Sequence, residues 1–298
     1  MSGARLTYAV VTPAHDEAET LPRLARCLAA QRVPPRSWII VENGSSDATP
    51  AIADELASEP WIRVIRVDGR HESVRGFPVV RAFHAGLDAL DTAPDVVVKL
   101  DADVSFEPDY FDGLLRAFAD DASLGIASGS AYELDRDGVW QQQFVTGASV
   151  WGASRAYRWQ CLQHVLPLEA HMGWDGIDAV KATMAGWRTR TLPHLPFHHH
   201  RTEGEREGER RKHWAARGDC FHYMGYRSWY VVLGALHHAR REPAALAMIV
   251  SYFSAALRGK PRCPDPSVRA YLRGEQRVGT LLQRRREALG TAAAAKSS

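Results

Sequence analysis

The sequence is poor in cysteine and has no long apolar run. Its 298 residues include four cysteines without a C-x-x-C pair, which excludes a zinc ribbon or disulfide scaffold and is typical of a reducing compartment. The apolar run at 8–11 is too short for a signal peptide and meets Pro13. The longest mostly apolar stretch, 244–257, would span about 21 Å as a helix, short of the roughly 30 Å bilayer core. We therefore expect a cytoplasmic protein without a membrane span.

Charge is unevenly distributed along the chain. The 37 basic and 35 acidic side chains leave a net charge of only +2. Residues 1–200 nevertheless carry 18 basic against 26 acidic side chains, whereas residues 201–298 carry 19 against 9. The apolar fraction of 45% is ordinary for a globular protein and excludes a disordered chain. The pattern predicts an acidic front part and a basic rear part that meet different partners.

The first hundred residues alternate short apolar runs with amphipathic segments, which is typical of a parallel sheet covered by helices on both faces. The predicted strands are 8–12, 38–41, 62–67 and 96–100. The predicted helices are 17–31, 49–57 and 83–90. The fold class is therefore α/β. Ligands of such sheets bind beyond the carboxyl ends of the strands, so the residues after each strand are candidates for a site.

Acidic residues follow three of these strands. Glu17 lies after the first, Glu42 after the second, and Asp101 and Asp103 after the fourth. Turns favour acidic residues at any one position. Acids at three strand ends of one sheet edge are better explained by a cation or a hydroxyl-rich ligand that offsets their repulsion. The two carboxylates of a D-x-D share one side of a strand, and such hard oxygen ligands suit Mg²⁺ or Mn²⁺ carrying a diphosphate.

Five segments, in this order along the chain, resemble the motifs of the inverting family-2 glycosyltransferases of the GT-A fold. They are 12–17 (TPAHDE), 41–49 (VENGSSDAT), 99–103 (KLDAD), 173–186 (GWDGIDAVKATMAG) and 197–201 (FHHHR). The resemblance covers about the first 205 residues. It implies a mostly parallel nucleotide-binding sheet flanked by helices, which binds a nucleotide-diphospho-sugar and a divalent metal, Mn²⁺ or Mg²⁺.

The resemblance also implies which residues contact the donor. The implied nucleoside contacts are Pro13, His15, Glu17 and Glu42. Glu42 replaces the usual aspartate and keeps a carboxylate that accepts a hydrogen bond from a base imide, which favours UDP over GDP. Arg75 stands where the family often has a basic residue near the diphosphate, and Asp101 would face the ribose or the metal.

The implied metal ligands are an acid of the D-x-D and a histidine. Asp103 would ligate the metal directly, with Asp101 as a further candidate. A histidine often follows the last strand of the domain. Here the tract is His198-His199-His200, and its register favours His199 over the other two.

The implied general base lies at the start of a helix. Counting back eleven residues from Gly186, as the family pattern does, gives Asp175, which would take the proton from the acceptor hydroxyl. Asp178, one helical turn further, is the alternative base or a helix cap. Trp174 occupies the position of the family's preceding glutamate and is expected on the acceptor side, as an apolar wall or a sugar-stacking platform. The segment at 147–148 (Gly147 and Ala148) lets the backbone approach the donor sugar or acceptor, or forms an ordinary turn.

The rear of the chain changes character. Residues 203–211 (EGEREGERR) predict a mobile loop that orders over bound donor, or a solvated connector. Two helical segments follow at 223–239 and 244–257, where aromatic residues alternate with arginines. This suits an anionic membrane surface, and packing on the catalytic domain is the alternative. The predicted division is a catalytic domain at 1–222, a helical extension at 223–290 and a disordered tail at 291–298.

We therefore expect an inverting, metal-dependent glycosyltransferase, peripheral on the inner face of the cell membrane, that acts on a glycan or lipid-linked acceptor. A sugar-nucleotide pyrophosphorylase would need a glycine-rich G-x-G-T-R-like loop after the first strand, which TPAHDE lacks. A nucleic-acid-binding protein would use the basic rear part, but it leaves Asp101, Asp103 and Asp175 unexplained, so no nucleic-acid partner is expected.

Overall fold

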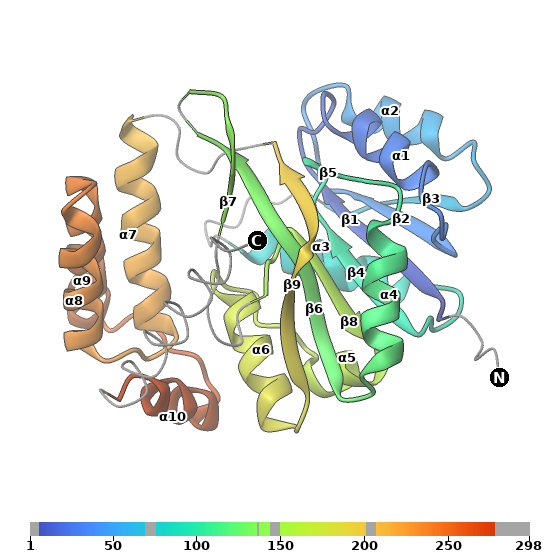
Figure 1. Ribbon diagram of the computed structural model, residues 1–298. Helices are drawn as coiled ribbons and strands as arrows, with labels where there is room; N and C mark the ends of the chain where they lie inside the picture. Colours follow the sequence, from blue (N-terminus) through green and yellow to red (C-terminus); the bar gives the residue numbers. More distant parts are fainter. Residues whose placement is uncertain (1–5, 69–75, 136, 144–149, 201–206, 278–298) are drawn as a thin grey trace. The chain divides into compact units, whose positions relative to one another are not determined.

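The computed structural model describes residues 6–68, 76–135, 137–143, 150–200 and 207–277 (Figure 1). The chain divides into two compact units. The first comprises Met1–Ala170 with Trp174–Thr202, and the second comprises His171–Gly173 with Glu203–Ser298. Arg75, Gly147, Ala148 and the tail at 291–298, all named above, lie outside the described residues.

The first unit is built on a sheet with the strand order β3-β2-β1-β4-β8-β6-β9-β5 among the described residues, and β7 pairs with β6. Strands β3, β2, β1 and β4 are parallel, and β8 runs antiparallel to both β4 and β6. Strand β9 is parallel to β6, and β5 is antiparallel to β9. The strands are β1 (Tyr8–Ala14), β2 (Ser37–Glu42), β3 (Ile62–Arg66), β4 (Val96–Leu100), β5 (Val104–Phe106), β6 (Leu124–Leu134), β7 (Trp140–Gln142), β8 (Ser154–Arg158) and β9 (Arg188–His199).

Helices cover both faces of this sheet, because alternate strand residues point to opposite sides (Figure 1). Val10 belongs to one hydrophobic core and the adjacent Val11 to the other. The helices that pack on the core of Val10 are α1 (Leu21–Ala29), α2 (Thr49–Leu56) and α4 (Tyr110–Asp120). The helices that pack on the core of Val11 are α3 (Phe77–Asp88), α5 (Trp159–Val165) and α6 (Trp174–Met184). The predicted α/β class with a mostly parallel, helix-flanked sheet is confirmed.

Two helix boundaries in this unit differ from the sequence prediction. Helix α1 begins at Leu21 instead of Glu17, because the four residues 17–20 form a hydrogen-bonded turn beside the loop that follows β2. Helix α3 begins at Phe77 instead of Phe83. Its first turn contains a proline, which is tolerated there because the first N–H groups of a helix have no partner within it.

The second unit is helical. Its elements are α7 (Glu207–Tyr223), α8 (Ser228–Ala239), the 3-10 helix η1 (Pro243–Leu246), α9 (Ala247–Leu257) and α10 (Pro266–Glu275). Trp214 of α7 shares a core with Val231 of α8 and Met248 of α9. No helix among the described residues combines the length and the apolar character that crossing a bilayer requires.

Helix α7 bears on two predictions. It begins at Glu207, so residues 207–211 of the predicted loop at 203–211 are helical. The second unit comprises His171–Gly173 with Glu203–Ser298 and includes this helix, whereas the predicted helical extension runs from 223 to 290 and stays a prediction. The physical reason is close helix packing: a Cβ on Gly218 would lie only 2.2 Å from the Met248 carbonyl oxygen, so the backbones of α7 and α9 are nearly in contact. The sequence segment 207–211 looked unable to pack because it is so highly charged.

Candidate active site

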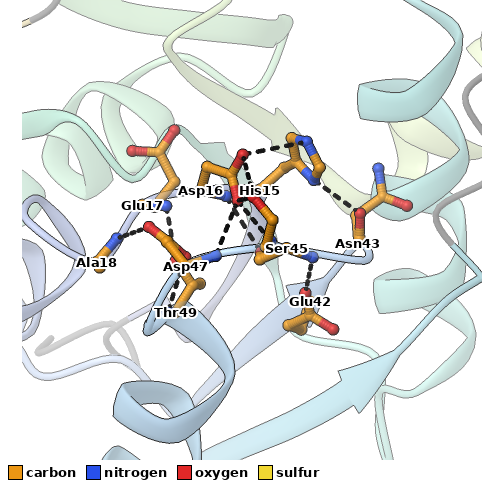
Figure 2. Close-up of polar contacts among 10 residues, drawn as sticks. His15, Asp16, Glu17, Ala18, Glu42, Asn43, Ser45, Asp47 and Thr49 are labelled. Carbon is orange, nitrogen blue, oxygen red and sulfur yellow. Dashed lines mark hydrogen bonds and ion pairs between the residues drawn. The ribbon is translucent and has the colours of Figure 1, made fainter.

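Side chains of two loops at the carboxyl edge of the sheet bond the loops to each other (Figure 2). Asp16, after β1, has a positive φ of 55°. Its carboxylate accepts hydrogen bonds from the backbone N–H groups of Ser46 at 2.7 Å and Asp47 at 3.3 Å, both after β2. In return, the Asp16 N–H donates to the Ser45 hydroxyl at 3.1 Å. The backbone hydrogen bond from Ser46 is the main reason that the pKa of Asp16 is lowered.

A second set of bonds extends this connection to the start of α2. The Glu17 N–H donates to the Thr49 hydroxyl at 2.7 Å, and the Ala18 N–H donates to Asp47 Oδ2 at 3.1 Å. Asp47 Oδ1 also accepts the Thr49 N–H at 2.8 Å. The D-x-T of the second motif therefore fixes the first motif in place. Both loops form one preorganised surface at the end of β1 and β2, as a nucleotide site requires.

The four residues named as nucleoside contacts lie on this surface. Pro13 pairs with Val41 across β1 and β2, and Glu42 ends β2. His15 Nδ1 donates to the Asn43 carbonyl oxygen at 2.9 Å. Buried Glu42 accepts the Ser45 N–H through Oε1 at 2.6 Å, and Glu17 Oε2 accepts the Thr20 hydroxyl at 2.6 Å. The structure thus brings these residues together at the ends of β1 and β2, and side-chain hydrogen bonds hold His15, Glu17 and Glu42.

Asp101, Asp103 and His199 converge where β4, β5 and β9 meet. Asp101 follows β4, Asp103 precedes β5, and His199 ends β9, where it pairs with Val104. One ligand atom from each of the three lies within 4.8 Å of the others. His199 Nε2 is 3.5 Å from Asp103 Oδ2, and its Nδ1 is 3.2 Å from Glu133 Oε1. Two carboxylates and an imidazole are a donor set that fits Mn²⁺ or Mg²⁺.

The other two histidines of the tract have different neighbours. The ring of His198 lies 4.5 Å from that of Trp140, centroid to centroid. His200 Nε2 is 2.7 Å from the Ser105 hydroxyl. Within the part of the chain that the structure describes, neither histidine joins the candidate metal-binding cluster of Asp101, Asp103 and His199. The geometry therefore singles out His199, the histidine that the sequence register favoured.

The pKa values of His199 and Asp101 in this cluster are both raised from their ordinary values. Burial lowers the pKa of His199, but hydrogen bonds to Asp103 and Glu133 outweigh burial and raise it to about 10. Burial raises the pKa of Asp101, and the ammonium group of Lys99 counters that effect. At neutral pH the carboxylates are thus compensated by Lys99 and a protonated imidazole. A divalent cation that bound through His199 would have to displace the histidine proton.

Lys99 is a site residue that the sequence reasoning missed. It is buried in β4 and forms an ion pair with Asp101. Its ammonium group also donates to the Gly152 carbonyl oxygen at 3.1 Å and lies 5.5 Å from the centroid of the Trp174 ring. The signal was present, because a lysine within the apolar strand VVVKL is costly to bury without a specific anionic partner.

Asp175 lies in the first turn of α6, close to the start of β8. A Cβ on Gly152 would lie 3.2 Å from Asp175 Oδ2, so this carboxylate lies beside the residue whose carbonyl oxygen binds Lys99. Half-buried Asp175 is thereby connected to Asp101 through Lys99 and Gly152. Trp174 is only 8% exposed and packs in the core, which favours the apolar wall over the sugar-stacking platform.

Asp178 is in a different environment. Its side chain is 1% exposed, and Arg155 binds both of its oxygens, with Nε 2.9 Å from Oδ2. The Tyr157 hydroxyl donates to the same carboxylate. Burial raises the pKa of Asp178, and Arg155 and Tyr157 oppose that rise. Arg155 also donates to the Asp175 carbonyl oxygen at 2.7 Å, so this buried group holds the start of α6 on β8.

We expect the variant Arg155→Met to lose about 3–5 kcal/mol of unfolding free energy, because it leaves the Asp178 carboxylate buried without its cation. Urea denaturation measures the loss. The matched control is Arg66→Met, since Arg66 forms an exposed pair with Asp54 and its removal should change stability little. Equal stability of the two variants would contradict the structural role of the buried pair.

The fold and this edge of the sheet define the class of protein. The mixed sheet flanked by helices is similar to the solved structure of the mannosyltransferase PcManGT from Pyrobaculum calidifontis in complex with GDP-Man and Mn²⁺. The two share 16% identity and superpose with a TM-score of 0.55 over 98% of this chain and 87% of that one. The fold is that of the GT-A glycosyltransferases.

The family follows from the sequence itself. The model of glycosyl transferase family 2 matches residues 9–178, which is more than half of the chain. The chain belongs to this family. It is 34% identical over 124 residues to polyprenol monophosphomannose synthase of Mycolicibacterium smegmatis, covering 41% of this chain and 44% of that protein. It is also 34% identical over 110 residues to undecaprenyl-phosphate 4-deoxy-4-formamido-L-arabinose transferase of Pectobacterium carotovorum, covering 36% and 32%. The chain thus spans less than half the length of these relatives.

Proposed function

We propose that the protein is an inverting, metal-dependent glycosyltransferase, which moves a sugar from a nucleotide-diphospho-sugar to a hydroxyl group of a lipid-linked or polysaccharide-precursor acceptor. The observation that carries this proposal is the convergence of Asp101, Asp103 and His199. Lys99 pairs with Asp101 and donates to the carbonyl oxygen of Gly152, beside which the Asp175 carboxylate lies. The two relatives named above support a lipid-linked acceptor, because both are named for lipid phosphates. Membership of a transferase family leaves the pyrophosphorylase and nucleic-acid alternatives without support.

The donor end of the reaction is assigned to the metal-ligand cluster. Asp103 and His199 would hold the divalent ion, and Asp101 would face the ribose or the ion. When bound, that ion would neutralise the charge that develops on the leaving diphosphate. Lys99 fixes the Asp101 carboxylate and adds a positive charge at this edge. The two bonded loops after β1 and β2 would hold the nucleoside through Pro13, His15, Glu17 and Glu42.

The acceptor end of the reaction is assigned to Asp175. Its carboxylate would take the proton of the acceptor hydroxyl as that oxygen attacks the anomeric carbon on the face opposite the diphosphate, which inverts the configuration. Asp178 is not assigned this role, because its two oxygens are bound by Arg155 and Tyr157 inside the core. Trp174 would exclude water beside the reacting groups.

A thermal-shift screen tests the donor. We expect one class of sugar nucleotide, with UDP sugars favoured over GDP sugars by the Glu42 carboxylate, to raise Tm in the presence of Mn²⁺. A ligand at one hundred times its Kd stabilises the native state by about 2.7 kcal/mol. The matched control is Asp103→Asn, whose Tm should rise much less with the same sugar nucleotide and Mn²⁺. Failure of every UDP and GDP sugar to shift Tm would refute the proposed donor.

A further inference from the structure

Helix α8 and the continuous segment of η1 and α9 each carry an apolar stripe on the side that faces away from their shared core (Figure 1 places α8 and α9). The stripe residues recur at intervals of four and three, which is the spacing of one helical face. They account for seven of the nine large apolar side chains that are exposed among the described residues. We call the two stripes together the outer apolar face: Trp229, Leu233, Leu236, Leu246, Val250, Phe253 and Leu257.

Among the described residues, the packing of the helical unit does not use this face. Val231 and Ala235 of α8, and Met248 and Tyr252 of α9, fill the core on the opposite side of each helix. The exposure of the outer face is large, reaching 68% at Val250 and 89% at Leu257. Single exposed apolar residues are ordinary, but a concentration of this kind on two adjacent helices indicates an interaction surface.

Exposed basic residues flank the segments that carry the outer apolar face along the chain. Between residues 227 and 262 the sole acidic residue is Glu242. The basic residues lie at the helix ends and are exposed, and one of them, Lys260, also pairs with Asp219. They are Arg227, Arg240, Arg241, Arg258, Lys260 and Arg262. Apolar side chains with arginines at the helix ends match the depth profile of a bilayer interface, where acyl chains lie beneath anionic headgroups.

From the apolar stripes together with the basic residues, we infer that the outer apolar face docks on an anionic lipid bilayer. Helices α8 and α9 would lie in the interface and not cross it. A second copy of the chain fits the face less well, because a symmetric pairing would bring the same arginines against each other. Nucleic acid fits the charge but not the apolar stripes. The docking depends on the helical unit alone and goes beyond the proposed transfer reaction.

Vesicle flotation with the full-length chain tests the inference without any donor. We expect flotation with vesicles of phosphatidylglycerol and phosphatidylcholine in equal parts, and binding at least tenfold weaker to phosphatidylcholine alone or at about 0.5 M salt. The double variant Val250→Glu with Phe253→Glu should lower binding to the anionic vesicles at least tenfold. Arg241→Gln and Arg258→Gln should each lower it about fivefold.

Two controls separate docking from folding and from self-association. Met184→Glu changes an exposed apolar residue of the first unit and should leave vesicle binding within twofold of wild type. The double variant should still show the Tm shift of the wild type with donor and Mn²⁺, so its defect is confined to docking. Absence of flotation on the anionic vesicles would overturn the inference, as would wild-type binding by the double variant. A dimer that the double variant converts to a monomer in light scattering, without vesicle binding, would assign the face to self-association instead.

Discussion

Replacing Asp175 with asparagine should lower the rate of sugar transfer by about a hundredfold to ten-thousandfold, while donor affinity stays within a few-fold of wild type. The carboxylate is the group that would accept the acceptor proton, and an amide of the same shape cannot accept it. The nucleoside contacts and the metal ligands come from other strand ends, so the donor should still bind. Steady-state transfer kinetics and donor titration by calorimetry give the two numbers.

The control for this experiment is Asp178→Asn, which changes a carboxylate of the same helix. Because Arg155 and Tyr157 enclose Asp178, this variant should lose stability but keep most of its turnover when it is assayed well below its Tm. A near-wild-type rate for Asp175→Asn would show that Asp175 is not the base. A large loss of turnover for Asp178→Asn in a folded protein would move the assignment to Asp178.

The strands, and the acids that follow them, could be predicted from the sequence because both depend on local patterns. The apolar runs around Val10, Ile39 and Val97 are buried on both faces, and a continuous apolar run is what such strands require. The acids that follow these runs must therefore meet at one edge. For the same reason Asp101 and Asp103 were recognisable as a pair before their neighbours were known.

The contacts that organise the site were not accessible in this way, because they join segments far apart in the chain. No local pattern pairs Lys99 with the Gly152 carbonyl, or encloses Asp178 between Arg155 and Tyr157. The first arrangement depends on β8 lying next to β4, an adjacency that β8 reaches only after the chain has passed through four other elements. The second depends on α6 packing against β8. The partners that enclose a buried charged group can be identified only when the residues packed around it are known.

The charge asymmetry of the chain acquires a physical interpretation from the two units. Part of the acidity of the front part is concentrated at Asp101, Asp103 and Glu133, where a cation is the natural complement. Part of the basicity of the rear part lies at the helix ends beside the outer apolar face. The nearly neutral total thus hides two oppositely charged regions, for which we propose a cation and an anionic lipid surface as the respective partners.

Removing the divalent metal should abolish transfer, and restoring Mn²⁺ or Mg²⁺ should recover it. At the level of the chain, Asp103→Asn and His199→Gln should each weaken Mn²⁺ binding by more than the roughly 10–100-fold that loss of an outer partner of a metal ligand costs. Both variants remove one of three converging ligand atoms that lie within 4.8 Å of each other. Calorimetric titration with Mn²⁺ alone, without donor, measures the affinity independently of activity.

The matched control is His198→Gln, because His198 is adjacent in sequence but lies against Trp140 and outside the three-ligand cluster. It should bind Mn²⁺ with nearly wild-type affinity. If His198→Gln loses the metal and His199→Gln keeps it, the ligand is misassigned by one residue. If the chelated enzyme turns over at the wild-type rate, the acids at this edge bind the sugar or the ribose and not a metal. Lys99, which pairs with Asp101, would then be the candidate for stabilising the charge on the leaving diphosphate.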